Sequence, residues 1–367
     1  MYIDVLLLFK FPMPILINTH VFKSIKEKIN ESVSALRKHQ RWKCKQAVPS
    51  VLTNGKLKVL FFGTDAFSLP SLQALHKSCF DSRSLGIVTS FKNPANCVRT
   101  YAEHHRLPLY RWPIVPDICG GYDLGVVVSF GHLIPEKIIR AFPNGMINVH
   151  ASLLPRWRGA APIIYAIMNG DAKTGVSIMK IEPKHFDVGD ILAQQEVVIQ
   201  DGILMPELHN QLAIEGANLL VTTIQEFPRY LENTTRQNND FATFAPKITT
   251  TITEVNWTQI SAEQLHRRFR ALFGYKNLNT IFQNKIVQLI DVQLPLPQKL
   301  PDALRNVECG GFYYDRKKRC LLVRCAADSY VEIHQLRIEG KKVMTAQDFN
   351  NGFLKQINTT QHYFTTK

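Results

Sequence analysis

The chain has 367 residues, of which 45% are hydrophobic and 20% are charged, a composition typical of a globular protein with room for two domains. Its most apolar stretch, residues 1–18, contains Asp4, Lys10 and two prolines, so we expect no membrane-spanning helix and no membrane partner. The seven cysteines include no C-x-x-C pair, which favours a reducing compartment over a disulfide framework.

The net charge of +14 is unevenly distributed along the chain. Residues 1–58 hold 11 Lys or Arg and 3 Asp or Glu, residues 59–245 hold 15 and 17, and residues 246–367 hold 18 and 10. A near-neutral body between two basic ends predicts a catalytic unit with a module that binds a polyanion. The alternative is that the basic ends only increase solubility.

Residues 1–56 have the pattern of an N-terminal extension. Apolar residues recur at helical spacing among lysines and arginines, and acids are few; these apolar positions are Phe22, Ile25, Ile29, Val33 and Leu36. A basic amphipathic segment of this kind is typical of a mitochondrial targeting (transit) peptide. Residues 1–18 fit this less well, and are either a cleaved signal or an upstream start that is not used.

Residues 57–150 alternate between apolar strands and helices. We expect strands at residues 57–62, 85–89, 107–112, 123–130 and 145–150, and helices at 67–79, 94–105 and 135–142. This alternation predicts an α/β domain, residues 57–231, with a doubly wound, mainly parallel sheet covered on both faces. Gly63-Thr64-Asp65 after the first strand lacks G-x-G-x-x-G spacing, and no Walker motif occurs, which excludes a nicotinamide fingerprint and a P-loop.

The second half of the chain continues this domain and then changes character. We expect a helix at 160–169, strands at 175–181 and up to about 199, and a helix at 206–227. Residues 232–245, here called the linker, are polar. A helix at 262–273, with Ser261 and Gln264 spaced as a capping box, is followed by short strands at 286–292, 311–314, 320–324 and 331–338. These strands predict a small β-barrel domain, residues 246–360, with basic residues at its turns.

Polar side chains near the end of the central strand carry the candidate chemistry. Asn148 and His150 lie two positions apart and therefore on one face, and Asp187 follows in a glycine-containing loop. An amide N–H, an imidazole and a carboxylate at a sheet edge suit acyl transfer, in which they stabilise an oxyanion and move a proton. No Ser or Cys is placed as a nucleophile, which favours direct transfer.

Simpler interpretations of these residues stay open at this point. Asn148 and His150 are alternatively buried polar groups satisfied by the backbone, and Asp187 a turn residue. His132, His150 and Asp187 are also zinc-ligand types, but they lack the spacing of known zinc motifs, and we expect no metal.

Several motifs together resemble the methionyl-tRNA formyltransferases over about residues 57–353. The resemblance is carried by Asn148-Val149-His150, by the run Ser-Leu-Leu-Pro-Arg-Trp-Arg-Gly-Ala-Ala-Pro at 152–162, and by the segments at 61–64, 126–135, 174–179, 187–190, 244–248 and 340–349. It implies transfer of a formyl group from 10-formyltetrahydrofolate to the methionine of initiator methionyl-tRNA, by a mitochondrial (matrix) enzyme that we expect to be a monomer. It also implies a second domain similar to oligonucleotide-binding barrels.

The resemblance assigns roles to individual residues. The catalytic set is Asn148, His150 and Asp187. The folate-binding set is Phe130, Gly131, His132, Leu133, Ile134, Ser152, Leu153, Leu154 and Pro155. The basic residues expected to contact tRNA are Arg156, Arg158, Lys247, Arg267, Lys317, Lys318, Lys341 and Lys342.

One segment departs from the family pattern. Bacterial members carry a longer basic loop after the second strand, whereas the corresponding loop here, residues 89–94, is short and resembles that of the organellar enzymes of animals. An alternative function is another formyltetrahydrofolate-dependent formyltransferase, or a hydrolase, acting on a small substrate. The basic C-terminal domain argues against it, because a small substrate needs no polyanion-binding surface. A non-catalytic RNA-binding protein is disfavoured because Asn148, His150 and Asp187 are all present.

Overall fold

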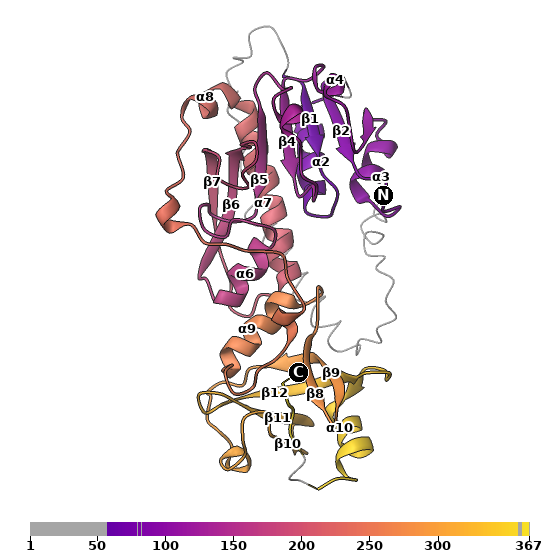
Figure 1. Ribbon diagram of the computed structural model, residues 1–367, viewed down its shortest axis with the longest axis vertical. Helices are drawn as coiled ribbons and strands as arrows, with labels where there is room; N and C mark the ends of the chain where they lie inside the picture. The colour runs from indigo at the N-terminus through magenta and orange to yellow at the C-terminus, as the bar shows by residue number, and fades with distance from the viewer. Residues whose placement is uncertain (1–56, 79, 82, 359–361, 367) are drawn as a thin grey trace, which may run out of the picture. The chain divides into compact units, whose positions relative to one another are not determined.

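The computed structural model describes residues 57–78, 80–81, 83–358 and 362–366 (Figure 1). The predicted targeting segment, residues 1–56, lies outside these residues. None of the helices in the described part of the chain is both long enough and apolar enough to cross a membrane.

A seven-stranded sheet forms the first domain, in the order β3-β2-β1-β4-β5-β6-β7 (Figure 1). Its strands are β1 (Val59–Phe62), β2 (Leu85–Thr89), β3 (Leu109–Arg111), β4 (Leu124–Val128), β5 (Met146–His150), β6 (Lys173–Lys180) and β7 (Ile191–Val198). The first five strands are parallel, and β6 and β7 are antiparallel to their neighbours. The prediction of a doubly wound, mainly parallel sheet is confirmed.

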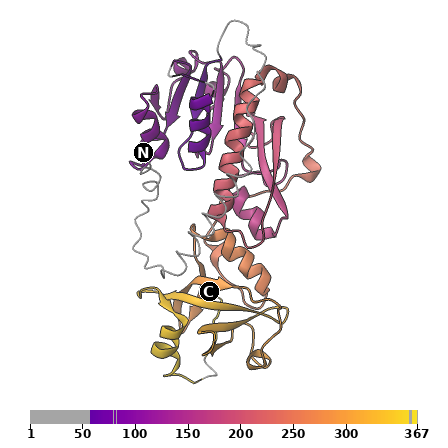
Figure 2. The same cartoon turned by 180° about the vertical axis from the view of Figure 1, so that it is seen from behind.

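The two faces of this sheet are buried in separate cores. Val59 and Phe61 of β1 belong to one core, whereas Leu60 and Phe62 belong to the other, as expected for alternating side chains on a strand. The first face is covered by α2 (Ser68–Ser78), α3 (Cys97–His104), α6 (Pro162–Asn169) and the long α7 (Met205–Gln225), and Figure 2 shows α7 lying along the sheet. The short helices α4 (Pro116–Cys119) and α5 (Glu136–Ile139) contribute to the core on the second face.

The C-terminal domain is an antiparallel sheet in the order β10-β11-β12-β9-β8, with β13 paired to β12. Its elements are α9 (Ala262–Leu272), β8 (Leu278–Phe282), β9 (Lys285–Gln293), β10 (Phe312–Asp315), β11 (Cys320–Cys325), β12 (Ser329–Ile338), β13 (Met344–Thr345) and α10 (Ala346–Phe349), followed by a π-helical turn at Asn350–Leu354. The predicted capping box of Ser261 and Gln264 is present at the start of α9. Strand β8, β13 and α10 were not predicted.

The C-terminal segment joins the two edges of this sheet. Residues Ile281 of β8 and Thr365 exchange backbone hydrogen bonds of 3.0 and 2.9 Å, and Phe364 N donates to Gly310 O at 2.8 Å beside β10. The edge strands are therefore bridged by residues 362–366, which closes the curved sheet in the manner expected of a small barrel. Phe364 is buried and stacks on Trp257, with their ring centroids 5.9 Å apart.

The linker lies against the first domain instead of running free. It follows α8 (Phe227–Glu232) and contains a short 3-10 helix, Asn239–Phe241. Thr235 exchanges two backbone hydrogen bonds of 2.8 Å with Ile191 of β7, and Arg158 N donates to Thr243 O at 2.8 Å. Two further 3-10 helices, Thr251–Thr253 and Asp302–Leu304, lie in the C-terminal domain.

Candidate active site

The candidate site lies where the strand order reverses, between β1 and β4 and the adjacent end of β5. The loops after these parallel strands meet at one edge, the usual position of a ligand in a doubly wound sheet. Ser129 Oγ donates to Asp65 Oδ2 at 2.5 Å, and Thr64 Oγ1 donates to the carbonyls of Ser129 and Phe130 at 3.0 and 3.1 Å. These contacts tie the loop after β1 to the loop after β4.

His150 and Asp187 are brought together across this edge. His150 Nδ1 lies 3.7 Å from Asp187 Oδ1, and both side chains are largely buried, with 7% and 14% of their surface exposed. His150 Nε2 lies 3.0 Å from Trp157 O. Asn148 is half-buried in β5, two positions before His150 and therefore on the same face. The backbone contact of His150 expected in the simpler interpretation is present, together with a facing carboxylate that a purely structural histidine does not need.

The conformation of Asp187 directs its carboxylate toward His150. Its φ of 55° lies in the left-handed region, which Asp tolerates better than most residues. Gly159 N donates to Asp187 Oδ2 at 2.8 Å, which leaves Oδ1 to face His150. The loops at 156–160 and 186–190, which are distant in sequence, thus meet through one carboxylate.

The Ser-Leu-Leu-Pro segment is fixed by side chains that sequence reasoning missed. Ser152 Oγ donates to Arg156 O at 2.6 Å. From β6, Ser177 Oγ donates to Ser152 O at 2.6 Å and accepts from Leu154 N at 3.0 Å. Gln194 of β7 donates to Leu154 O at 3.0 Å. Ser177 lies within the 174–179 motif, so its position in that motif was the available signal.

The second predicted folate-binding segment, residues 130–134, follows β4 at the same edge. Phe130 is buried and contacts the rings of Phe62 and Trp112 edge-on, at centroid distances of 5.4 and 5.1 Å. His132 packs beside Phe130 at 5.1 Å, whereas Leu133 is exposed. The segment therefore has an aromatic base and an exposed apolar residue beside it, and its assignment to folate stays a prediction.

The two arginines of the central run are engaged within the protein. Arg156 forms a two-point ion pair with Asp171, with Nε–Oδ2 and Nη2–Oδ1 distances of 2.8 and 2.6 Å, which raises the pKa of Arg156. Its guanidinium also lies 4.3 Å from the Trp157 ring. Arg158 is buried and donates to Gln237 Oε1 from Nε and Nη2 at 3.0 and 2.7 Å. Burial lowers the pKa of Arg158, and the neighbouring Asp187 carboxylate opposes this effect.

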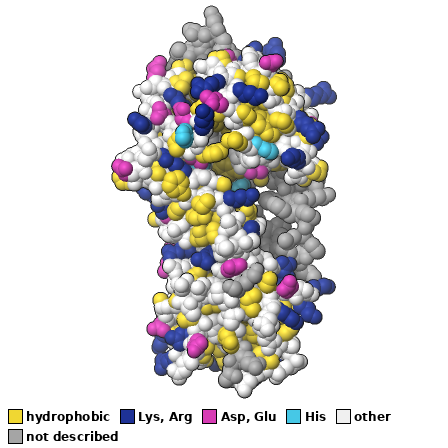
Figure 3. Space-filling model, in the orientation of Figure 1, with side chains coloured by type: hydrophobic (Ala, Val, Ile, Leu, Met, Phe, Trp, Pro, Cys, Tyr) yellow, Lys and Arg dark blue, Asp and Glu magenta, His cyan; other side chains and the backbone are white. Residues whose placement is uncertain are grey.

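Most of the basic residues predicted in the C-terminal domain lie on its surface. Lys247, Lys317, Lys341 and Lys342 are exposed, whereas Arg267 is paired with Glu263 at 3.3 Å and Lys318 with Glu332 at 2.5 Å. On the face seen in Figure 3, Lys and Arg side chains are scattered among acidic ones. Lys247, Lys317, Lys341 and Lys342 therefore remain available to a phosphate backbone.

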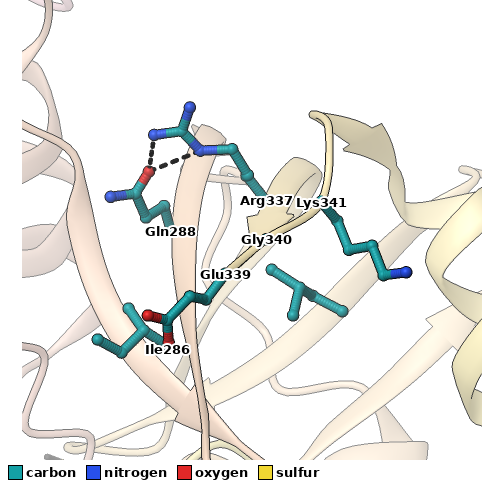
Figure 4. Close-up of a pocket in the computed structure, with 7 residues that line it drawn as sticks. Ile286, Gln288, Arg337, Glu339, Gly340 and Lys341 are labelled. Carbon is teal, nitrogen blue, oxygen red and sulfur yellow. Dashed lines mark hydrogen bonds between the residues drawn. The ribbon is translucent and has the colours of Figure 1, made fainter.

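Lys341 lines an open pocket of about 310 Å³ beside β9 and the end of β12 (Figure 4). Within it, Arg337 Nε donates to Gln288 Oε1 at 2.8 Å, and Lys341 extends away from that pair. All of its lining residues belong to the C-terminal domain, whereas His150 and Asp187 belong to the first domain.

Within the described residues, the potential metal ligands whose atoms lie within 4.8 Å of one another are Cys320, Glu332 and His334. Lys318 already neutralises Glu332 at 2.5 Å. His132 forms no such group with His150 and Asp187, so the zinc alternative for these three residues has no geometric support in this part of the chain.

A second open pocket, of about 680 Å³, lies beside the Asp187 loop. It is lined by His185, Val188 and Asp190 near Asp187, by Arg158, and by the linker residues Arg236, Gln237, Asn239, Ala242 and Phe244. The contribution of the linker was not predicted, because a polar, Asn-rich segment carries no pattern that distinguishes a buried glutamine from exposed ones.

Comparisons with known proteins agree with this architecture. Residues 120–224 match the family model described as formyl transferase, and residues 247–354 match formyl transferase, C-terminal domain. The human mitochondrial methionyl-tRNA formyltransferase is 37% identical over 307 residues, which cover 81% of this chain and 78% of that protein. The methionyl-tRNA formyltransferase of Coxiella burnetii (strain CbuK_Q154) is 32% identical over 310 residues, which cover 80% of this chain and 95% of that one. An N-formyltransferase from Helicobacter canadensis, solved with folinic acid and dTDP-3-aminofucose, has a TM-score of 0.59 at 16% identity and covers 76% of this chain and 98% of its own, a likeness of fold alone.

Proposed function

The chain belongs to the methionyl-tRNA formyltransferase family, and we propose that it transfers the formyl group of 10-formyltetrahydrofolate to the α-amino group of methionine on initiator methionyl-tRNA. The observation that carries the proposal is the pairing of His150 with Asp187 at the reversal point of the sheet, in a chain that also carries the family's C-terminal domain. A folate formyl donor is supported by the family and by the N-formyltransferase solved with folinic acid.

The proposed reaction is a direct transfer. The neutral methionine amine attacks the formyl carbon, a C–N bond forms, and the bond from that carbon to N10 of the folate breaks. Asn148 donates its side-chain N–H to the oxyanion that develops on the formyl oxygen, and protonated His150 supports the same charge. Asp187 stabilises the imidazolium and, through water, receives the proton that the amine loses, while N10 takes up a proton as it leaves. These side chains supply the charge stabilisation and proton transfers, so the proposal includes no metal.

The remaining assignments are proposals on the same basis. We propose that residues 130–134 and 152–155 line the folate, that the exposed lysines of the C-terminal domain contact the tRNA backbone, and that the enzyme acts as a monomer. Similarity to mitochondrial enzymes supports a mitochondrial location, and we propose the matrix.

The deciding experiment incubates the full-length chain with 10-formyltetrahydrofolate and methionyl-tRNA and measures acid-stable formylmethionine on the tRNA. Formylmethionyl-tRNA is the expected product. Free formate without formylated tRNA would identify a hydrolase, and formylation of a small amine only would identify the alternative formyltransferase.

A further inference from the structure

The linker contacts the two loops, at 156–160 and 186–190, that meet at the Asp187 carboxylate. Thr243 O accepts from Arg158 N at 2.8 Å, and Ala245 N donates to Arg158 O at 2.7 Å, so the linker pairs with the loop that contains Gly159. Gln237 donates from Nε2 to the carbonyls of Asp187 and Gly189 at 3.0 and 2.8 Å. The linker, of which only Phe244 and Ala245 belong to a motif quoted above, therefore contacts the backbone of both loops that meet at the Asp187 carboxylate.

Gln237 uses its whole side-chain amide in these contacts. Its two N–H groups serve the two carbonyls, and its oxygen accepts both bonds from Arg158. Because Gln237 is only 6% exposed, these bonds take the place of hydrogen bonds to water that the buried polar groups lose on folding. Glutamate has the same shape and an acceptor for Arg158, but it has no N–H for the carbonyls.

The hydrogen bonds from Gln237 to the two carbonyls act on Asp187, whose backbone conformation sets the direction of its carboxylate. Asp187 has a left-handed backbone, a conformation that costs energy and persists only where the surrounding structure enforces it. Gln237 donates a hydrogen bond to the backbone carbonyl of Asp187, and Gly159 N donates one to Asp187 Oδ2. Together these bonds leave Oδ1 directed at His150.

We propose that Gln237 is a positioning residue for Asp187: it keeps the carboxylate facing His150 and is needed for turnover, not for substrate binding. This inference rests on the proposed function, because it assigns Asp187 its catalytic role. It further predicts that the linker, although polar in sequence, contributes to catalysis.

The test compares Gln237→Glu and Gln237→Ala with wild type in the full-length chain. Glutamate should reduce kcat by about tenfold or more, on the scale of a misplaced catalytic group. KM for both substrates should stay within about twofold, since neither substrate is bound by Gln237 in the proposal. Alanine, which also removes the hydrogen bonds from Arg158 to Gln237 and leaves its bond to Asn239, should reduce kcat at least as much.

A matched control is Thr235→Ala, an exposed linker position whose contacts with Ile191 are made by the backbone and survive the change. We expect it to keep wild-type kcat. Rates are expressed per folded molecule, measured by circular dichroism at the assay temperature. If Gln237→Ala unfolds, Gln237→Glu, which keeps the volume and the Arg158 contact, decides alone. A wild-type kcat in folded Gln237→Glu overturns the proposal.

A double-mutant cycle separates positioning from general damage. If Gln237 acts through Asp187, its substitution should add little to the loss already caused by Asp187→Asn. Full multiplication of the two losses, or a rise in KM without a change in kcat, overturns the proposal. Failure of the proposed function is distinguished by the wild-type assay, because a wild type that forms no formylmethionyl-tRNA refutes that function before any variant is compared.

Discussion

His150 presents Nδ1 to Asp187 Oδ1 at 3.7 Å while its Nε2 lies 3.0 Å from Trp157 O. Because a carbonyl can only accept, Nε2 carries a hydrogen in this arrangement. Nδ1 is then the nitrogen that faces the carboxylate. In the proposed reaction, this carboxylate stabilises the protonated form of His150.

Replacing the charge without changing the shape tests this arrangement. In Asp187→Asn, the amide oxygen can still accept from Gly159 N, but no anion faces His150. We expect kcat to fall by at least about 10²-fold, the scale of one acid–base contribution, and His150→Ala to cause a similar loss. Single-turnover formylation measures both. Asp117→Asn, at an exposed position of α4, should retain wild-type rates, and turnover near wild type in Asp187→Asn would remove this carboxylate from the mechanism.

Glycine is required at position 159 both because of its backbone conformation and because Ala245 lies close to it. Its φ is +122°, and an added Cβ would lie 2.6 Å from Ala245 O in the linker. Gly159→Ala should therefore displace the backbone N–H that holds Asp187, lower the free energy of unfolding by about 1–3 kcal/mol, and reduce kcat. Urea unfolding and steady-state kinetics measure the two effects. Gly202→Ala is the matched control for a positive φ, since an added Cβ there meets nothing within 4 Å; equal kinetic losses in both would show that the linker contact is irrelevant.

The sequence predicted the sheet well because its strands have clear physical signatures. Continuous apolar runs such as Leu124–Val128 are typical of strands covered on both faces, and these strands were located to within a few residues. Strand β8, Leu278–Phe282, was missed because it is short and includes Asn279, a residue type that is depleted in strands. The closing segment at 362–366 has too few residues to show any period.

The site was predictable only in part. Asn148, His150 and Asp187 could be named as candidates because their residue types suit one reaction and a family resemblance groups them, and their catalytic role stays a proposal. Ser177 and Gln194 hold the backbone of Ser152 and Leu154, and Gln237 holds the backbone of the Asp187 loop, through hydrogen bonds to carbonyls and amides. Such contacts depend on the three-dimensional path of the chain and leave no spacing rule in the sequence.

The exposed turn after β12 provides a test of tRNA binding. Lys341→Ala should raise KM for methionyl-tRNA and leave kcat unchanged, because the residue lies in a turn of the C-terminal domain and not among the residues of the candidate active site. The dependence of log affinity on log salt should become shallower by up to about one. Lys77→Ala, at an exposed position on α2, removes the same charge from the catalytic domain and serves as the control. Identical KM values in the two variants would exclude Lys341 as a contact.

The closing segment makes the C-terminal domain dependent on its last residues. Phe364 is 1% exposed and packs against Trp257, Phe282 and Phe312. Phe364→Ala should lower the free energy of unfolding by about 3–5 kcal/mol, the usual cost of deleting a buried aromatic ring. Thermal unfolding followed by tryptophan fluorescence measures it. Tyr363→Ala, at the neighbouring exposed position, should lower the free energy of unfolding much less. Equal effects of the two substitutions would show that the packing of Phe364 does not stabilise the domain.

Acid should destabilise the C-terminal domain through His266 in α9. Burial, with a smaller effect from the Arg270 cation, lowers the pKa of His266 to about 4. In the unfolded chain the pKa of His266 is about 6.5, so the unfolded chain binds a proton at pH values where the folded protein does not. The contribution of His266 to stability is therefore complete above about pH 6.5 and is lost between about pH 6.5 and 4. Allowing for partial exposure, we expect a loss of about 2 kcal/mol over this window. His266→Gln should lose less stability than wild type between pH 7 and 4.5 in urea titrations, because its side chain takes up no proton; an unchanged slope would assign the acid sensitivity to other groups.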